Sequence, residues 1–508
     1  MTKSLPERPD LDQLKTQAKD LLKQIRAGAP EAVARVPQNE LAGFALADAQ
    51  RIIAREYGFP NWMKFKQHVE TRNPTTTGRA LVQAALRGQA DAVADILREY
   101  PRLSRGSIHV VAALGDPTGV RDWLLHDPKL AVTRGRESKW SPILFACVGR
   151  VGGDDAARAE CVKQLLAAGA DANDYWTDEA FPDAKLPALY GATGVNNYPL
   201  TARALLAASA NPDDDESVYH AAEHAHFESL EVLKEFGANL SHSAAKFGGN
   251  TPLYFLFEVI GGGMTREKGA RWLLEHGANP NVPCRDLQET AFQAAVRRGY
   301  SVDLIQLMLN CGADPALRRA DGRNALALAV RGGHAEVAAV LRARGVPEEV
   351  SLADRFLGAC LRADRAATRQ LLAENPRLLA ELTPADRGMV TEAAREGRGD
   401  ALTLMGELGF DLQLAEEQGV TPLHSAAWCG RIAAVRALIA AGVDINAEEE
   451  RFKGTPLGWA QHGSRFNGDP AGDYPACAEA LLAAGALLPE EFYGTPEVVA
   501  VFQRYAKK

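Results

Sequence analysis

The stretch from Gly419 to Asn446, GVTPLHSAAWCGRIAAVRALIAAGVDIN, holds two short helix patterns, and related stretches recur along the chain. Thr421 can cap the first helix, and Pro422 fits its first turn. Gly430 breaks the chain before a second amphipathic pattern, which Gly442 ends. Such a helix pair buries its apolar face only against neighbouring pairs. The repetition therefore restricts the chain to a stack of helix pairs.

Weaker copies carry the same pattern of a helix start, an apolar first helix and a second helix. We number as repeats three to eight the segments that begin at Ser141, Leu186, Ser217, Thr251, Thr290 and Asn324. Repeat eleven begins at Thr421 and repeat twelve at Thr455. The TPLH motif with its Ala-Ala pair resembles the ankyrin repeat. The resemblance implies an all-α solenoid of about twelve repeats between Gly78 and Ala486.

The organisation of the chain follows from where this pattern stops and restarts. ALVQAALRGQADAVADILREYPRL parallels FLGACLRADRAATRQLLAENPRLL, so the array opens twice with atypical repeats. Ahead of it, QAKDLL and REYGF resemble a helical module that often precedes ankyrin arrays in bacterial proteins. We expect four parts: an N-terminal helical module over 1–74, repeats one to eight over 79–345, repeats nine to twelve over 350–486, and a capping helix over 487–508.

Composition excludes several classes of protein. The 508 residues have a formal net charge of −8, which disfavours nucleic acid as a partner. The polar start and the lack of an apolar run of membrane-spanning length predict neither a secretion signal nor a membrane span. Seven scattered cysteines without a CxxC pair fit a reducing compartment. The sequence thus predicts a cytoplasmic protein.

Four repeats are longer than the rest between their two helices. Repeats three, four, six and twelve carry seven, two, five and nine extra residues. Tyr198 lies in the insert of repeat four, whereas His462, Asp469 and Tyr474 lie in or beside the glycine-rich insert of repeat twelve. Long surface loops cost little, so these inserts are either tolerated loops or ligand-contacting loops.

The same four repeats have an aromatic residue four positions after the helix start. These residues are Phe145, Tyr190, Phe255 and Trp459. In ankyrin-like repeats this position tends to face the concave groove, so the resemblance implies contact platforms for a peptide or a flat small molecule. Placement in the core is the alternative.

A longer connection, DANDYWTDEAFPDAKLP over 171–187, holds Tyr175 and Trp176 among acidic residues. Exposed Tyr and Trp side chains are typical anchors for a protein partner. The alternative is that this finger folds back onto the next repeat.

Histidines are the strongest candidates for chemistry. The resemblance implies a structural role for His220 and His424, which stand in the TPLH position. His220 and His224 are spaced for a metal, but HExxH is missing and we expect Glu223 to point off their face, so we predict no metal.

Proton transfer is a separate hypothesis. His224, Glu258 and His462 share the position seven after the helix start, and with Asp469 and Tyr474 they could transfer protons.

These observations favour a binding protein. Phosphate-loop, dinucleotide and nucleophile-elbow motifs are missing, so no cofactor is predicted. We expect a cytoplasmic scaffold that binds a protein or peptide partner through its concave groove and loops. The alternative is a small-molecule-binding protein or cofactor-free enzyme whose site combines the groove aromatics with the four inserts. Candidate binding residues are Phe145, Tyr175, Trp176, Tyr190, Tyr198, Phe255, Glu258, Trp459, His462, Asp469 and Tyr474.

Overall fold

The computed structural model describes residues 11–36, 43–66, 74–135, 138–178, 181–242, 250–258, 263–467 and 469–507. The chain forms two compact units, residues 1–211 and 212–508, which we describe separately as unit 1 and unit 2.

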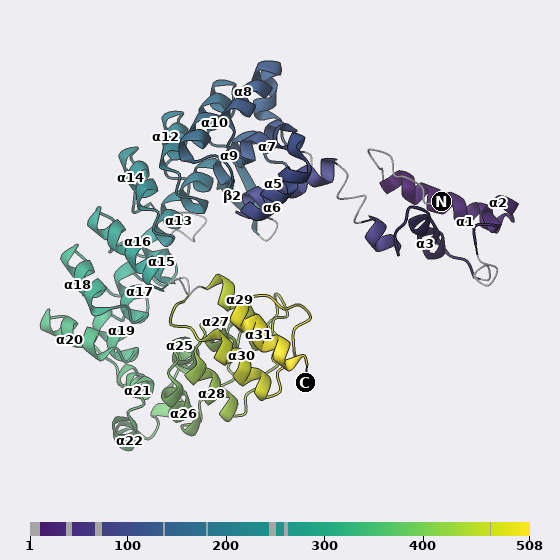
Figure 1. Ribbon diagram of the computed structural model, residues 1–508. Coiled ribbons are helices and arrows are strands. Elements are labelled where there is room, and N and C mark those ends of the chain that lie inside the picture. The colour runs from purple at the N-terminus through teal and green to yellow at the C-terminus, as the bar shows by residue number, and fades with distance from the viewer. Residues whose placement is uncertain are drawn as a thin grey trace. The chain divides into compact units, whose positions relative to one another are not determined.

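The described N-terminal residues of unit 1 include three complete helices and have a core of their own. These are α1 (Leu11–Arg26), α2 (Pro30–Val33) and α3 (Leu46–Glu56). Helix α1 packs on α3 (Figure 1), and its apolar stripe is buried there as the amphipathic pattern predicts. The side chains in this core are Leu14, Ala18, Leu21, Ile25, Ala32, Val36, Phe44, Ala49, Ile52, Ile53, Ala54 and Phe65.

The rest of unit 1 is a series of helix pairs interrupted by one hairpin. Its helices are α5 (Pro74–Leu86), α6 (Ala90–Glu99), η2 (Pro101–Arg105), α7 (Ile108–Ala113), α8 (Pro117–His126), η3 (Pro128–Val132), α9 (Pro142–Val148), α10 (Asp155–Ala167), α11 (Ala188–Tyr190), the π-helical turn η4 (Gly191–Val195) and α12 (Pro199–Ala207). The antiparallel strands β1 (Tyr175–Asp178) and β2 (Phe181–Pro187) pair in the finger between α10 and α11.

Unit 2 continues with helix pairs. They are α13 (Ser217–Glu223), α14 (Phe227–Glu235), α15 (Pro252–Glu258), α16 (Gly263–Glu275), α17 (Ala291–Arg297), α18 (Val302–Asn310), α19 (Ala325–Arg331), α20 (Ala335–Ala343), α21 (Leu352–Leu361), α22 (Arg365–Glu374), α23 (Leu378–Glu381), α24 (Pro384–Arg387), α25 (Met389–Arg395), α26 (Gly399–Glu407), η6 (Glu417–Gly419), α27 (Pro422–Trp428), α28 (Ile432–Ala440), α29 (Pro456–Phe466), α30 (Tyr474–Ala483) and α31 (Pro496–Tyr505).

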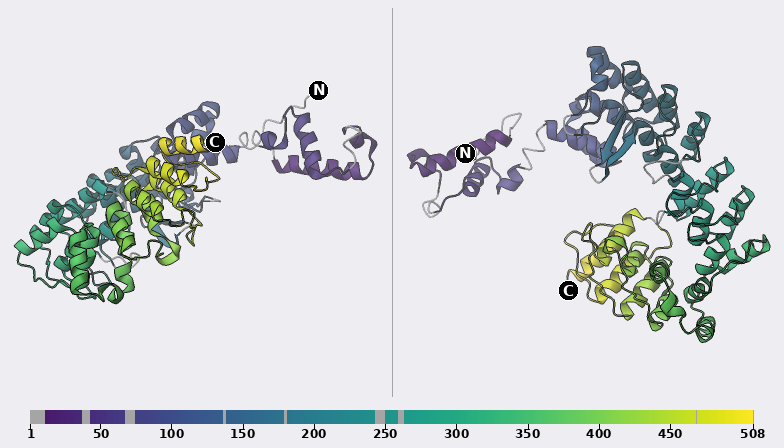
Figure 2. Two further views of the ribbon diagram at one scale, coloured as in Figure 1. Left: turned by 90° about the horizontal axis from the view of Figure 1, so that it is seen from below. Right: turned by 180° about the vertical axis from the view of Figure 1, so that it is seen from behind.

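Stacking between successive pairs builds the core of unit 2. The first helices α13, α15, α17, α19 and α21 pack one on the next, and the second helices α16, α18 and α20 form a parallel row (Figure 1). At the C-terminal end, drawn in yellow in Figure 2, α31 packs on α30. Its Val498 and Phe502 side chains are buried.

Capping explains why the repeats begin where they do. Thr421 accepts a hydrogen bond from the backbone N–H of His424, and its own backbone N–H donates to His424 Nδ1 at 3.2 Å. The Nε2 atom of His424 lies 3.0 Å from the carbonyl oxygen of Gly454 in the next repeat. The ring is fully buried, so the predicted structural role of His424 is confirmed. In repeat seven, Thr290 and Gln293 form the same capping box.

The described residues contain no helix that is both long and apolar enough to cross a membrane. All seven cysteines are free thiols, and six of them are buried.

Candidate binding surfaces

Unit 1 carries a continuous series of aromatic rings, which we call the aromatic strip: His109, Trp140, Phe145, Trp176 and Tyr190. Ring centroids are 5.5 Å apart for His109 and Phe145, and 5.3 Å for Phe145 and Trp140. The series continues over 5.0 Å to Trp176 and 5.6 Å to Tyr190, with the last two rings stacked. Each distance is typical of a favourable aromatic contact. Three successive repeats and the hairpin thus contribute to one surface.

The hairpin places Trp176 in the strip. Trp176 pairs with Leu186 and Tyr175 with Pro187, and successive residues of a strand point to opposite faces. Trp176 therefore folds back onto Tyr190, while Tyr175 stays 37% exposed with Lys185 Nζ 4.7 Å from its ring centroid. Trp176 thus follows the alternative in which the finger folds back onto the next repeat, whereas Tyr175 stays exposed as a possible anchor for a partner would.

An ion pair fixes the base of the hairpin. Asp174, which directly precedes β1, accepts hydrogen bonds from Arg134 Nη2 at 2.5 Å and from the Ser141 hydroxyl. Because Ser141 is the N-cap of α9, this contact joins the finger to the start of repeat three.

Phe145 is not the groove-facing surface residue that its repeat position implied. Its side chain is only 4% exposed, because Trp140 and His109 pack against it, so it supports the strip instead of facing a partner. Trp140, Trp176, Tyr190 and His109 are all partly exposed. Sequence reasoning missed Trp140 and His109. The available signal for Trp140 was its place directly before the helix start of repeat three.

A second group of rings lies at the end of unit 2, and we call it the C-terminal aromatic cluster: Trp428, Trp459, His462, Phe466 and Tyr493. Trp428 contacts Trp459 at 5.9 Å and stacks on His462 at 5.7 Å between centroids. His462 also lies 4.3 Å from Phe466, and its Nδ1 atom is 3.2 Å from the hydroxyl of Tyr493. Burial lowers the pKa of His462. Trp428 was missed, although it shares the repeat position of His462.

The insert of repeat twelve is fastened to repeat eleven. It lengthens α29 as far as Phe466, and then Asn467 Nδ2 donates to the carbonyl oxygen of Trp428 at 2.9 Å. Asp469 accepts from Arg431 at 2.6 Å, and the backbone N–H of Asp473 donates to Gly430. These contacts make the insert part of the repeat stack.

Tyr474 and Asp469 therefore do not fit the proton-transfer hypothesis. Tyr474 belongs to the hydrophobic core, and burial raises its pKa to about 12. The carboxylate of Asp469 is engaged by Arg431. Of the residues in the proton-transfer hypothesis, only His462 belongs to the C-terminal aromatic cluster.

The inserts of repeats three and four are also tied down. The fully buried Arg158 donates to the carbonyl oxygens of Val151 and Gly153 in the insert of repeat three, at 2.9 and 3.0 Å. In repeat four, Asn196 Nδ2 donates to Cys147 O at 3.0 Å, and Tyr198 donates to Gly149 O at 3.2 Å. Tyr198 thus anchors the insert. Of the insert of repeat six, residues 259–262 lie outside the described residues, and 263–268 belong to α16.

Phe255 and Glu258 belong to a different environment. The ring of Phe255 meets Tyr219 edge-on at 4.9 Å. Glu258 accepts hydrogen bonds from Arg297 at 2.6 Å and from Arg298 at 3.3 Å, so its carboxylate is committed to ion pairs.

One prediction about α13 is wrong. We expected Glu223 to point away from His220 and His224, yet its Oε2 atom lies 2.9 Å from His220 Nδ1 and 3.9 Å from His224 Nε2. The physical reason is that residues three apart are neighbours on a helix surface.

Comparison with known proteins identifies ankyrin repeats in two parts of the chain. Family models described as ankyrin repeats match residues 265–351 and 407–457. An ankyrin repeat-containing protein of Treponema pallidum (strain Nichols) is 39% identical over 97 residues, which are 19% of this chain and 30% of that protein. The chain thus spans less than a third of this relative's length. The crystal structure of the human ASB11 ankyrin repeat domain is 25% identical, with a TM-score of 0.36 over 47% of this chain and 98% of that domain. With its repeat motifs and stacked helix pairs, the chain is an all-α ankyrin-repeat solenoid that resembles bacterial ankyrin-repeat proteins.

Proposed function

We propose that this chain is a cytoplasmic scaffold that binds a protein or peptide partner, and that the aromatic strip of unit 1 is the main contact surface. Ankyrin repeats are typically protein–protein interaction modules, and stacked repeats offer extended binding surfaces. The observation that carries the proposal is the unbroken series of rings from His109 to Tyr190, four of them partly exposed. Seven free thiols support a reducing compartment.

The strip suits an extended peptide. Aromatic side chains lose little conformational entropy on binding and supply large contact areas, which is why Trp and Tyr dominate binding hot spots. A row of rings accommodates the side chains or proline rings of a chain that runs along it. Tyr175 and Lys185 at the exposed face of the hairpin add a polar edge to the surface.

The test compares two surface variants of the full chain in pull-downs from the native cells. One variant is Trp140→Ala/Trp176→Ala, and the other, a matched control in the C-terminal aromatic cluster, is Trp428→Ala/Phe466→Ala. We expect proteins captured by the wild type to be depleted about tenfold or more by the strip variant, since hot-spot truncations cost about 2 kcal/mol or more. Thermal unfolding of both variants checks that they fold.

Equal capture of every partner by the wild type and the strip variant would refute the assignment of the strip. Loss of captured partners only in the control variant would assign the binding surface to the C-terminal aromatic cluster. The alternative function, a small-molecule site or cofactor-free enzyme, predicts a bound small molecule in native mass spectrometry of the purified chain. That molecule would be lost from the variant whose surface holds it.

A further inference from the structure

Three potential metal ligands of unit 2 meet at the C-terminal end of α13: His220, Glu223 and His224. One ligand atom from each lies within 4.8 Å of the others. Neighbouring ligands of a tetrahedral ion with bonds of about 2.0–2.1 Å are separated by roughly 3.3 Å. The observed separations of 2.9 and 3.9 Å from Glu223 Oε2 to the two rings bracket that value. Small side-chain rotations would therefore place all three around one ion.

Glu223 ends α13 at the position that Trp428 occupies at the end of α27 in repeat eleven. Its side chain is only 14% exposed, and a carboxylate with so little exposure costs free energy unless it is paired. Arg266 on α16 donates to Glu223 Oε1 at 2.6 Å, and this contact leaves Oε2 directed at the two histidines.

In the structure, His220 does not stand at the TPLH position. Because α13 aligns with α27 from end to end, Tyr219 stands where His424 stands in repeat eleven, and His220 stands where Ser425 does. The ring of His220 lies between two carboxylates, with its Nε2 atom 3.1 Å from Glu216 Oε2 and its Nδ1 atom 2.9 Å from Glu223 Oε2.

The arrangement of Glu216 matches that of an outer-shell metal-site residue. Histidines that bind metals usually donate their other ring N–H to a carboxylate, which fixes the tautomer and the orientation of the ring. Glu216 is buried and its Oε2 atom lies 3.1 Å from His220 Nε2, so Nδ1 is the ring nitrogen that faces Glu223.

The side chain of His224 is 54% exposed, which leaves the position open to an ion from solution.

We propose that His220 Nδ1, Glu223 Oε2 and His224 Nε2 bind one first-row divalent transition-metal ion, with Glu216 and Arg266 orienting the ligands. Two imidazoles and one carboxylate form a ligand set that zinc uses in proteins, with solvent in the remaining position. The site is independent of the aromatic strip.

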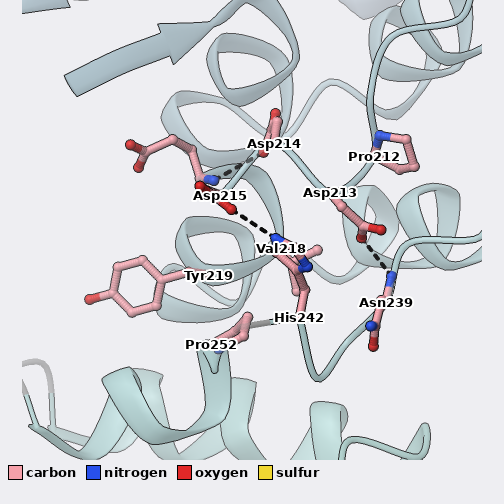
Figure 3. Close-up of a pocket in the computed structure, with 10 residues that line it drawn as sticks. Pro212, Asp213, Asp214, Asp215, Val218, Tyr219, Asn239, His242 and Pro252 are labelled. Atoms are coloured by element: carbon pink, nitrogen blue, oxygen red, sulfur yellow. Dashed lines mark hydrogen bonds and ion pairs between the residues drawn. The ribbon is translucent and has the colours of Figure 1, made fainter. Parts of the chain in front are cut away.

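A neighbouring pair provides a matched control. In the turn that leads into α13, Asp215 Oδ1 lies 2.9 Å from His242 Nε2, and Asp213 accepts from the backbone of Asn239 (Figure 3). Both groups line a cavity of about 20 Å³, which has room for roughly one water molecule. His242 is thus a partly exposed histidine that is held by one carboxylate in the same unit.

The test measures Zn²⁺ binding to the metal-stripped full chain by competition with a chromogenic chelator. We expect one equivalent with a dissociation constant in the micromolar range or tighter. His224→Ala and Glu223→Gln should each weaken binding by about tenfold or more, since even outer-shell changes cost about 10–100-fold. His242→Ala should leave binding unchanged, and circular dichroism checks the fold of each variant. Co²⁺ in place of Zn²⁺ should give the visible absorption bands of a site with nitrogen and oxygen ligands.

Three results would overturn the proposal. The first is less than one equivalent of Zn²⁺ on the wild type, which would mean that these side chains pair only with one another. The second is wild-type affinity in His224→Ala. The third is a thiolate-to-Co²⁺ charge-transfer band, which would place the ion at one of the seven free cysteines.

Discussion

Replacing Glu289 with glutamine tests how much one buried ion network stabilises unit 2. Glu289 is 0% exposed and accepts hydrogen bonds from Arg297 at 3.0 and 2.8 Å and from Arg319 at 2.6 Å. Burial disfavours its charge, but the hydrogen bonds and charges of the two guanidinium groups outweigh burial and lower its pKa. Glu289→Gln keeps the shape and removes the charge, so two partly buried cations lose their shared counter-ion.

Breaking a buried ion pair in this way costs about 3–5 kcal/mol. Arg297 keeps Glu258 and Arg319 keeps Asp321, so we expect the lower end, about 3 kcal/mol, as a fall in the free energy of unfolding. Urea is the appropriate denaturant, because it is uncharged and does not screen ion pairs. Hydrogen exchange of the α17 and α19 amides, measured in parallel, reports local opening of these repeats.

Glu349→Gln is the matched control. Glu349 accepts from Arg318 over the same 2.6 Å, but both side chains are exposed. An exposed pair contributes about 0–1 kcal/mol. If the two substitutions shift the urea midpoint equally, burial is not what makes the Glu289 network stabilising, and the reasoning is refuted.

Three further substitutions have defined outcomes. Arg158→Lys should destabilise unit 1 by about 3 kcal/mol in urea unfolding, because an ammonium group cannot reach the four carbonyl oxygens that the guanidinium group contacts; an unchanged midpoint would contradict this. Gly269→Ala should cost about 3 kcal/mol or more and speed amide exchange in α13, because a Cβ atom there would lie 1.9 Å from the carbonyl oxygen of Ala222; wild-type exchange would mean that α16 tolerates the shift. Burial raises the pKa of Glu396 to about 7 from its ordinary value of 4.5, so the wild type should lose up to about 3 kcal/mol of stability as the pH rises through that interval. The loss should be missing in Glu396→Gln, and parallel pH profiles of the two proteins would refute the shift.

The sequence predicted the repeat correctly because the signals are local. Thr421, Pro422 and Gly430 act within a few residues, and the structure shows the expected cap and the break between α27 and α28. The apolar stripe of α1 was likewise readable from its helical period. These features depend on the backbone conformation of one short segment, so no distant residue is needed to predict them.

The candidate surfaces were only partly predictable. Phe145 and Trp176 were singled out, but the strip also needs Trp140, which meets both only because the hairpin returns to the start of repeat three. Trp428 could have been found, since it stands in the same repeat position as His462 and on the preceding repeat. Arg266 could not have been found, because nothing in the sequence indicates that α16 brings it to Glu223.

The sequence by itself determined that the chain forms stacked helix pairs, because capping residues, helix period and terminating glycines act over single turns. Tertiary structure alone decided what the inserts and rings do. The inserts of repeats three, four and twelve are held by hydrogen bonds to buried or neighbouring backbone groups, and Tyr474 lies in the core. The reason is that each of these contacts depends on how a repeat packs on its neighbour, and a helix pattern specifies that a face is buried but not which side chain meets it.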